Sequence, residues 1–174
     1  RSHNMIRSKE DLKKNGRWFY RVNEYGYNYR LTDMQCALGI TQLAKLKKFV
    51  EKRRVIAKIY DDLLKNQDLL KIPQIDKNIY HSFHIYPLLI NFKKSKINKK
   101  KLFENLTRKK IYLQVNYQPL HLQPFLKNKY GFKKGDFPIS EKFYQNEVSL
   151  PIFYNLNKSQ QNYVVRNLLS NLLK

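Results

Sequence analysis

A short aromatic segment in front of a predicted helix carries the side chains best suited to bind an anion. It reads Gly-Tyr-Asn-Tyr-Arg-Leu-Thr-Asp over residues 26–33, with Asn28 and Arg30 just before the helix. The free N–H groups and the macrodipole of a helix N-terminus favour negative charge, so an amide and a guanidinium placed there could bind a phosphate or a carboxylate. The alternative is an ordinary turn, in which Asn28 tolerates a left-handed backbone and Arg30 extends into solvent.

A second segment with regularly spaced polar side chains covers residues 113–121, Leu-Gln-Val-Asn-Tyr-Gln-Pro-Leu-His. Its polar residues alternate with apolar ones at the end of a predicted strand, and a proline-bounded loop follows. Side chains at such a strand end could bind a ligand. The alternative is an edge strand with ordinary polar faces.

Other familiar kinds of site are not indicated. The histidines, His3, His81, His84 and His121, have neither i, i+4 spacing on a helix nor a cysteine partner, which argues against a metal site. The glycines are isolated, so the sequence has no P-loop, dinucleotide fingerprint or nucleophile elbow. Spacing alone therefore predicts a soluble α/β domain and assigns it no reaction.

The net charge of +22 would suit a nucleic-acid-binding domain, because lysine and arginine neutralise phosphates. Lysine heavily outnumbers arginine, however, and arginine does most of the forked recognition of phosphates and bases. The lysines are also dispersed over nearly every polar stretch instead of forming one stripe. We therefore interpret the charge as a solvated, lysine-rich surface and expect no nucleic-acid partner, with a basic binding domain as the alternative.

The cellular location is indicated by the lengths of the apolar stretches, the N-terminal residues and the single cysteine. No stretch approaches the ~18 consecutive apolar residues that a membrane span needs, and the first residues lack the apolar region of a signal peptide. The lone Cys36 cannot form an internal disulfide, which fits a reducing compartment. We expect a cytoplasmic protein without a membrane partner.

A long helix should follow the aromatic segment. Thr32 and Gln35 have the spacing of a capping box, in which each side chain bonds the backbone N–H of the other residue. Apolar residues at helical spacing continue to about Asn66, although the register slips near residues 44–45, so two consecutive helices are as well supported as one. Pro73 prevents further helix.

The pattern of the remaining sequence predicts a small α/β sandwich behind this helix. Residues 6–24 are interpreted as a loop, as are the proline-rich residues 118–138. Pro87 should place part of the strand predicted at 83–92 at a sheet edge or a bulge. The order of elements is β-α-β-α-β-α, with strands at 83–92, 112–117 and 149–153 and helices at 97–110, 140–147 and from 157 onward.

Taken together, these segments resemble the DegT-type family of sugar aminotransferases over nearly the whole chain. Residues 26–39 resemble the family's Gly-x-Asn-x-Arg motif with its following helix, and residues 114–121 resemble its Val-His-Tyr-x-Pro-x-His segment. The series of similar motifs continues in order through Arg1-Ser2-His3, Gln42-Leu43, Lys52-Arg53-Arg54, Tyr60, His84-Ile85-Tyr86-Pro87 and Ser149-Leu150-Pro151. Within the family, the resemblance is greatest to the branch that acts in pseudaminic acid synthesis.

The resemblance implies the C-terminal portion of a fold type I enzyme that uses pyridoxal 5'-phosphate. Such enzymes move an amino group from glutamate to a UDP- or dTDP-linked keto sugar, for surface polysaccharide or glycan precursors, and their active sites are shared between the two subunits of a homodimer. Asn28 and Arg30 would bind the cofactor phosphate, with Asn28 reaching the cofactor of the partner subunit. The nucleotide sugar would contact His84, Gln114, Val115, Asn116 and Tyr117.

The resemblance also implies a division of the chain and a missing residue. Residues 1–31 would be an arm and cofactor-phosphate loop, 32–66 the connecting helix or helix pair, and 67–174 the small α/β domain. The catalytic lysine is expected upstream of Arg1, so this chain alone should be inactive. An inactive interaction module of the same fold is therefore a further alternative.

Two positions depart from the family pattern. Asn4 replaces a usual glycine, which is tolerable where the turn needs a positive φ. Asn116 replaces a usual histidine; it keeps donor and acceptor capacity but cannot transfer a proton.

Overall fold

The computed structural model describes residues 3–173, and the chain forms two compact units that divide between Leu46 and Lys47. The division lies inside the long helix. The three-part division of this chain that the resemblance implies, at 1–31, 32–66 and 67–174, remains a prediction.

The N-terminal unit contains regular structure where the sequence predicted a loop over 6–24. Strands β1 (Met5–Ile6) and β2 (Arg21–Val22) pair antiparallel around helix α1 (Lys9–Asn15). The Ser8 hydroxyl caps α1 by accepting from the N–H of Asp11 at 3.0 Å, and the buried Asp11 carboxylate pairs with Arg21. The loop prediction was wrong. Ser8 and Asp11 have the spacing of an N-cap, which favours a helix, but the helix is short and polar and so shows no apolar periodicity.

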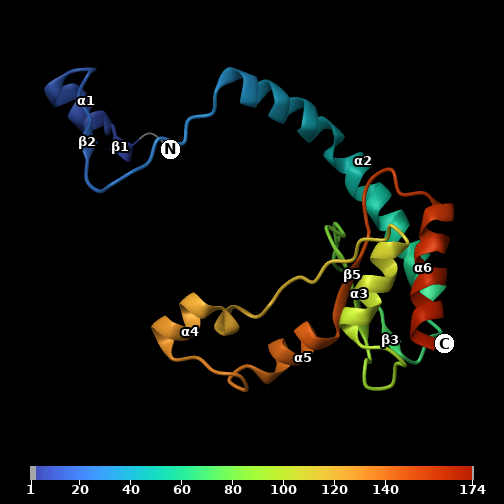
Figure 1. Cartoon of the computed structure of the whole chain (residues 1–174). Coiled ribbons are helices and arrows are strands. Elements are labelled where there is room, and N and C mark those ends of the chain that lie inside the picture. Colours follow the sequence, from blue (N-terminus) through green and yellow to red (C-terminus); the bar gives the residue numbers. More distant parts are fainter. Residues whose placement is uncertain (1–2, 174) are drawn as a thin grey trace. The chain divides into compact units, whose positions relative to one another are not determined.

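Helix α2 (Asp33–Leu64) is one continuous helix (Figure 1). Its predicted capping box is confirmed: the Gln35 N–H donates to the Thr32 hydroxyl at 3.3 Å, and the Thr32 N–H donates to the Gln35 amide oxygen at 2.9 Å. Only its second half is buried within this chain. Apolar residues of the first half are exposed in this chain: Met34, Leu38, Ile40, Leu43 and Leu46.

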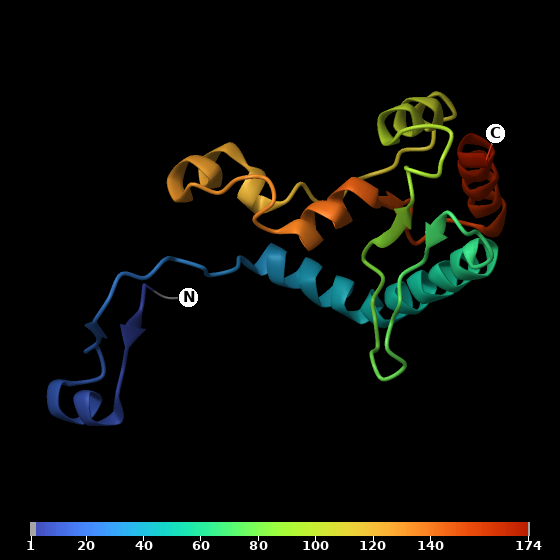
Figure 2. The ribbon, with the colours of Figure 1, turned by 90° about the horizontal axis from the view of Figure 1, so that it is seen from below.

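The C-terminal unit is built on a three-stranded antiparallel sheet in the order β3 (Leu70–Lys71), β4 (Tyr86–Ile90), β5 (Glu147–Leu150). Helices α3 (Lys99–Arg108) and α6 (Lys158–Leu173) pack against each other, and α5 (Pro138–Asn146) contacts β4. Figure 2 shows α5 and α6 on opposite sides of this sheet. The sheet is therefore the middle layer of the unit.

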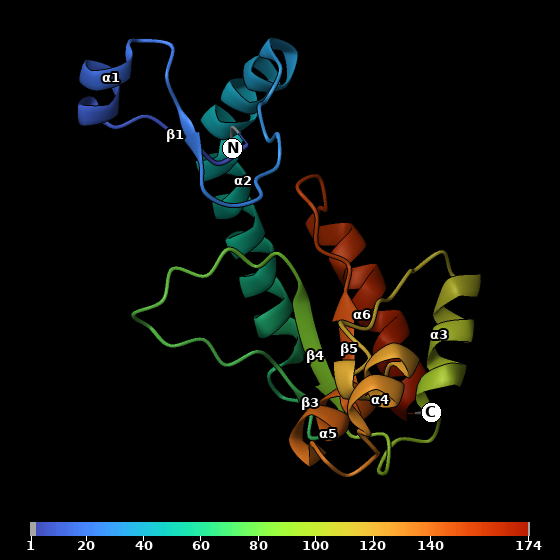
Figure 3. The same ribbon diagram turned by 90° about the vertical axis from the view of Figure 1, so that its left-hand side faces the viewer.

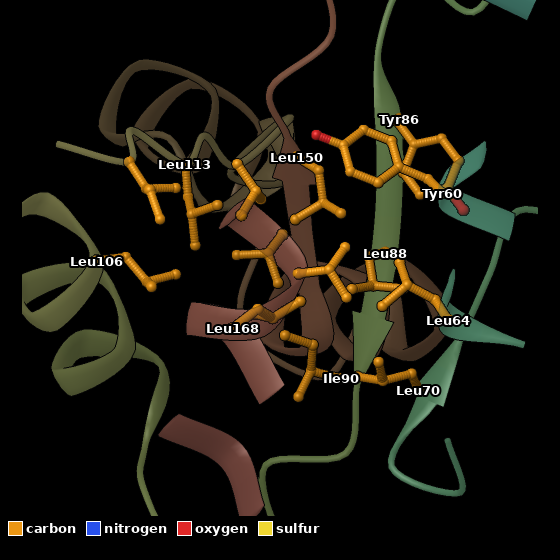
Figure 4. Packing of buried hydrophobic residues seen from close by; sticks show 14 of the residues in the cluster. Tyr60, Leu64, Leu70, Tyr86, Leu88, Ile90, Leu106, Leu113, Leu150 and Leu168 are labelled. Atoms are coloured by element: carbon orange, nitrogen blue, oxygen red, sulfur yellow. The ribbon is translucent and has the colours of Figure 1, made fainter. Parts of the chain in front are cut away.

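The apolar core lies on the α6 side of the sheet (Figure 4). On the central strand, every second side chain, Tyr86, Leu88 and Ile90, is fully buried on this face. Burial of each such leucine or isoleucine contributes about 1.5–3 kcal/mol relative to exposure. The second half of α2 and helices α3 and α6 supply the partners: Ile56, Ala57, Tyr60, Leu64, Leu102, Leu106, Val164, Val165, Leu168 and Leu172.

The predicted edge position of Pro87 is confirmed by the register. Pro87 pairs with Ser149, whose N–H and C=O both bond to Gln114, at 2.8 and 3.2 Å. The pair is therefore a non-hydrogen-bonded one, and Pro87 needs no N–H toward β5. On the other side, β3 pairs only with Leu89 and Ile90, so the edge beside Pro87 is open.

Two strand assignments in this unit were wrong. Residues 112–117 form no strand, and only Gln114 makes a bridge to β5. The third strand is instead β3, whose two residues are too short to show periodicity. The strand predicted at 149–153 begins at Glu147 and ends at Leu150, since Pro151 cannot donate to a ladder.

The segment predicted as a loop over 118–138 contains a 3₁₀ turn (Leu120–Leu122) and helix α4 (Pro124–Tyr130), seen with α5 in Figure 3. Pro124 occupies the first helical turn, and Gly131 ends the helix with φ of 70°. Proline at the start and glycine after the end mark a helix, so the local sequence does carry a signal for α4. Within residues 3–173, no helix is long and apolar enough to span a membrane.

Candidate functional site

The loop that carries Asn28 and Arg30 is fixed by a close backbone approach. A Cβ on Gly26 would lie 2.3 Å from the backbone nitrogen of Asn4 and 2.5 Å from the carbonyl carbon of His3. The His3 N–H donates to the Tyr27 carbonyl at 3.2 Å. Asn4 has φ of 55°, which confirms that its turn needs the positive φ that asparagine accepts. Arg1 and Ser2 of the same predicted motif lie outside the described residues.

Asn28 and Arg30 present polar groups beside the start of α2. The Asn28 amide oxygen accepts from the Arg30 backbone N–H at 3.3 Å, and both side chains are exposed. Among the described residues, neither the amide nitrogen of Asn28 nor the Arg30 guanidinium has a hydrogen-bond partner. These groups can therefore donate to an anion near the capped N-terminus of a 32-residue helix. The donor set fits a phosphate such as that of pyridoxal 5'-phosphate.

The second predicted segment lies along the outer edge of β5. The backbone of Gln114 bonds to Ser149 in both directions. Two residues further, the Asn116 backbone N–H donates to the Glu147 carboxylate at 3.0 Å. The segment is thus held at two points, Gln114 and Asn116. At Asn116 the bond partner is the Glu147 side chain and not the backbone of a neighbouring strand; we call this bond the tether.

The side chains of this segment differ in what they offer a ligand. Gln114 is exposed, Tyr117 is 76% exposed, and Val115 is half-buried. The Asn116 amide oxygen is enclosed and has no hydrogen-bond partner within residues 3–173. An external ligand can therefore meet Gln114 and Tyr117 directly, whereas Asn116 has only its amide nitrogen available on the half-buried side chain.

His84 lies apart from this segment. It is exposed and precedes β4, and its carbonyl accepts from Arg53 at 3.0 Å. Strand β5 separates β4 from Gln114, and the register places Asn116 level with Leu89, five residues along from His84. With ordinary strand dimensions, His84 and Asn116 are roughly 15 Å apart or more. The structure therefore does not bring His84 together with residues 114–117.

Two residues that support these segments were not predicted as functional. Arg53 on α2 donates to three carbonyls, those of Phe83, His84 and Ile152, at 3.0–3.2 Å. Glu147 is fully buried. A glutamate at the start of an apolar strand is the one sequence signal that could have indicated Glu147, because buried carboxylates need partners.

The main groove of the C-terminal unit lies away from the candidate residues. A groove of about 1000 Å³ lies between the β3–β4 pair and α5, and it is lined by residues 68–71, 89–93 and 138–146. None of the seven predicted site residues lines it. Among residues 3–173, no group of three His, Cys, Asp or Glu side chains could hold a metal ion.

Known proteins resemble this chain in sequence and in fold. Residues 2–169 match the model of the DegT/DnrJ/EryC1/StrS aminotransferase family. The chain is 45% identical over 138 residues to an uncharacterized protein of Methanocaldococcus jannaschii, covering 79% of this chain and 36% of that protein. It is 36% identical over 170 residues to the UDP-4-amino-4,6-dideoxy-N-acetyl-beta-L-altrosamine transaminase of Campylobacter jejuni, covering 98% of this chain and 44% of that enzyme.

The fold agrees with a solved structure from the same group. Helicobacter pylori PseC, an aminotransferase involved in pseudaminic acid biosynthesis, superposes with a TM-score of 0.82 at 28% identity. The match covers 99% of this chain and 44% of PseC. The chain thus spans less than half the length of each of these three proteins.

Proposed function

The chain belongs to the DegT/DnrJ/EryC1/StrS aminotransferase family, and on that premise we propose that it is the C-terminal part of a sugar-nucleotide transaminase. The whole enzyme would use pyridoxal 5'-phosphate to transfer an amino group from glutamate to a keto sugar carried on a nucleotide. Its relatives of the altrosamine transaminase type favour a UDP-linked sugar.

The observation that carries this proposal is the exposed donor pair beside the start of α2. The Asn28 amide nitrogen and the Arg30 guanidinium lie next to a helix N-terminus and have no partner among the described residues. In our proposal they bind the cofactor phosphate, where a charge-assisted hydrogen bond contributes about 1.5–3 kcal/mol. The bound cofactor supplies the electron sink for amino transfer, and these residues supply its placement.

The segment from Gln114 to Tyr117 would bind the nucleotide sugar. Gln114 and Tyr117 are exposed and can donate to or accept from sugar hydroxyls and phosphate oxygens. His84 would act at a different point, since β5 separates it from this segment. A substrate long enough to carry both a nucleotide and a sugar could contact both places, which agrees with the class proposed.

We propose further that the enzyme is a homodimer with shared active sites. None of the seven candidate residues lines the main groove of the C-terminal unit, and the first half of α2 exposes apolar side chains around its circumference. Both features are expected of a chain whose site is completed by the remainder of the fold and a partner subunit. The proposed location is the cytoplasm, whose reducing conditions suit the lone Cys36, which cannot form a disulfide within the chain.

The test is to read the coding sequence upstream of codon 1 and to assay its product. An in-frame segment with a cofactor-binding lysine is expected there. The purified full-length protein should then transfer the amino group of glutamate to a UDP-linked 4-keto sugar, with formation of 2-oxoglutarate. A full-length protein that binds the cofactor but aminates no UDP- or dTDP-linked keto sugar would contradict the proposed substrate class.

The 174-residue chain provides a second test. Mixed with pyridoxal 5'-phosphate and reduced with borohydride, it should show sparse label spread over several surface lysines. Stoichiometric labelling of a single lysine would show that the chain carries its own catalytic lysine and would contradict the proposed division of labour.

A further inference from the structure

The most completely buried carboxylate of the C-terminal unit lies directly behind the segment proposed to bind the sugar nucleotide. Glu147 has no exposed surface, and both of its carboxylate oxygens are engaged. One accepts from the Ser149 hydroxyl at 2.6 Å and the other from the Asn116 backbone N–H at 3.0 Å. A buried carboxylate is costly unless its oxygens are hydrogen-bonded and its charge is balanced.

Lys99 is a cation on which the charge of Glu147 acts. Its ammonium group donates to the Tyr144 carbonyl at 2.7 Å and lies over the Tyr144 ring. Burial lowers the pKa of Lys99, while the negative charge of Glu147 opposes this shift. The fully buried Glu147 and the half-buried Lys99 therefore interact near the junction of α3, α5 and β5.

Ser149 helps to position both Gln114 and the Glu147 carboxylate. Its backbone bonds Gln114 in both directions, and its hydroxyl fixes one oxygen of Glu147. The other oxygen is then directed at Asn116, two residues beyond Gln114. Backbone pairing with β5 is confined to the single bridge at Gln114, and within residues 3–173 the Glu147 side chain is the only group of β5 that bonds the backbone of Asn116.

We propose that Glu147 is a positioning residue, whose carboxylate fixes the backbone of Asn116 and so holds residues 114–117 in the conformation that binds the sugar nucleotide. The role of residues 114–117 in binding the sugar nucleotide rests on the proposed function. The hydrogen bond that holds the Asn116 backbone to Glu147 does not. Glu147 touches no substrate in this proposal and acts through Asn116.

The tether is tested on the 174-residue chain by the exchange of single backbone amides, measured by NMR. Glu147→Ala should accelerate exchange at the Asn116 N–H by about tenfold to a hundredfold, since it removes one hydrogen bond to a charged acceptor. Amides of Leu88 and Ile90 in the same spectra show whether the sheet remains folded. Glu104→Ala, which removes an exposed glutamate of α3 whose only ion pair is 3.8 Å long, is the matched control and should leave Asn116 unchanged.

Two further variants keep the test decisive if Glu147→Ala fails to fold. Glu147→Gln retains an acceptor for Asn116 and should preserve most of its protection, whereas Ser149→Ala frees the carboxylate and should reduce it. Unchanged exchange at Asn116 in a folded Glu147→Ala or Ser149→Ala chain would overturn the proposal.

In the full-length enzyme, Glu147→Ala should raise KM for the nucleotide sugar about tenfold or more, with little change in the affinity for pyridoxal 5'-phosphate. Glu147→Gln should restore most of the loss, a pattern that a general loss of stability would not produce. An unchanged KM in an active Glu147→Ala enzyme would overturn the positioning role. If the wild-type enzyme transfers no amino group, the proposed function fails, and the exchange measurement still decides whether the tether exists.

Discussion

The Nε2 atom of His121 lies 2.9 Å from the Glu141 carboxylate, and both side chains are buried although 20 residues separate them. The same carboxylate oxygen accepts from the Gly135 N–H at 2.7 Å. These bonds close the segment that contains α4 and the start of α5 into a loop. His121 also lies against the ring of Phe137, so the contact is partly apolar.

This contact predicts a loss of stability in acid. The hydrogen bonds from His121 and Gly135 hold the pKa of Glu141 below its usual value. A carboxyl group with a lowered pKa stabilises the fold above its unfolded pKa of about 4.3 and loses that contribution as the pH falls further. Glu141→Gln should therefore lower the thermal midpoint at neutral pH, and its curve should approach that of the wild type in acid. Thermal unfolding between neutral pH and acid measures this, with Glu104→Gln as the exposed control; parallel curves would contradict it.

The ionised carboxylate of Asp61 should affect folding stability in the opposite direction to that of Glu141. Burial raises the pKa of Asp61, and the hydrogen bond from the Tyr86 hydroxyl at 2.6 Å opposes the rise. A carboxyl group with a raised pKa destabilises the fold when ionised, so its cost disappears as the pH falls through its folded pKa. Asp61→Asn keeps an acceptor for Tyr86 and should be at least as stable as the wild type at neutral pH. Denaturant titrations of both proteins at several pH values test this; an advantage that grows in acid would refute it.

Two glycines should respond oppositely to alanine. At Gly26 a Cβ would collide with the backbone of Asn4, whereas at Gly39, in the first half of α2, nothing lies within 4 Å. Gly39→Ala should stabilise α2 by about 0.5–1 kcal/mol through helix propensity. Gly26→Ala should instead separate the two backbone segments and abolish exchange protection of the His3 N–H, which donates to Tyr27. Retained protection at His3 in Gly26→Ala would show that the loop accommodates a side chain.

The isolated chain should self-associate despite its charge. Met34, Ile40 and Leu43 are each more than two-thirds exposed on the first half of α2, and exposed apolar patches of a few hundred Å² favour association. Added salt should increase association, because it screens the repulsion between copies that each carry +22. Light scattering across concentration and salt measures this.

A matched pair of variants identifies the surface responsible. Leu43→Lys should reduce association, and Leu173→Lys on α6, where the leucine is 51% exposed, should not. A chain that stays monomeric in high salt would argue against a missing partner surface on α2.

Asn28→Ala in the full-length enzyme tests the cofactor site directly. Loss of one hydrogen bond to a charged phosphate should weaken the binding of pyridoxal 5'-phosphate by about tenfold to a hundredfold. Because the site is proposed to be shared, inactive Asn28→Ala subunits and inactive subunits without the catalytic lysine should restore activity when mixed. One site of such a mixed dimer would hold both intact residues. A simple turn role for Asn28 predicts lower folding stability, unchanged cofactor affinity and no complementation.

The features that the sequence determined by itself depend on neighbours in the chain. The Thr32 and Gln35 capping box, the positive φ at Asn4 and the open edge beside Pro87 follow from local stereochemistry, and the structure confirms each. The same holds for the ordered motifs that indicated the family. The sequence also carries local signals for α1 and α4, in the cap at Ser8 and in Pro124 with Gly131.

Tertiary structure alone decided which distant residues meet. Residues 112–117 have strand-like alternation, but β5 accepts backbone pairing only at Gln114, and Asn116 is held by a side chain 31 residues away. Arg53 is bonded to a carbonyl 99 residues along the chain, at Ile152. His84 was assigned to the same ligand as Asn116, yet the register of the sheet places the two apart. Side-chain spacing along a chain fixes local geometry, whereas the pairing of strands and the burial of a charge are settled by the packing of the whole unit.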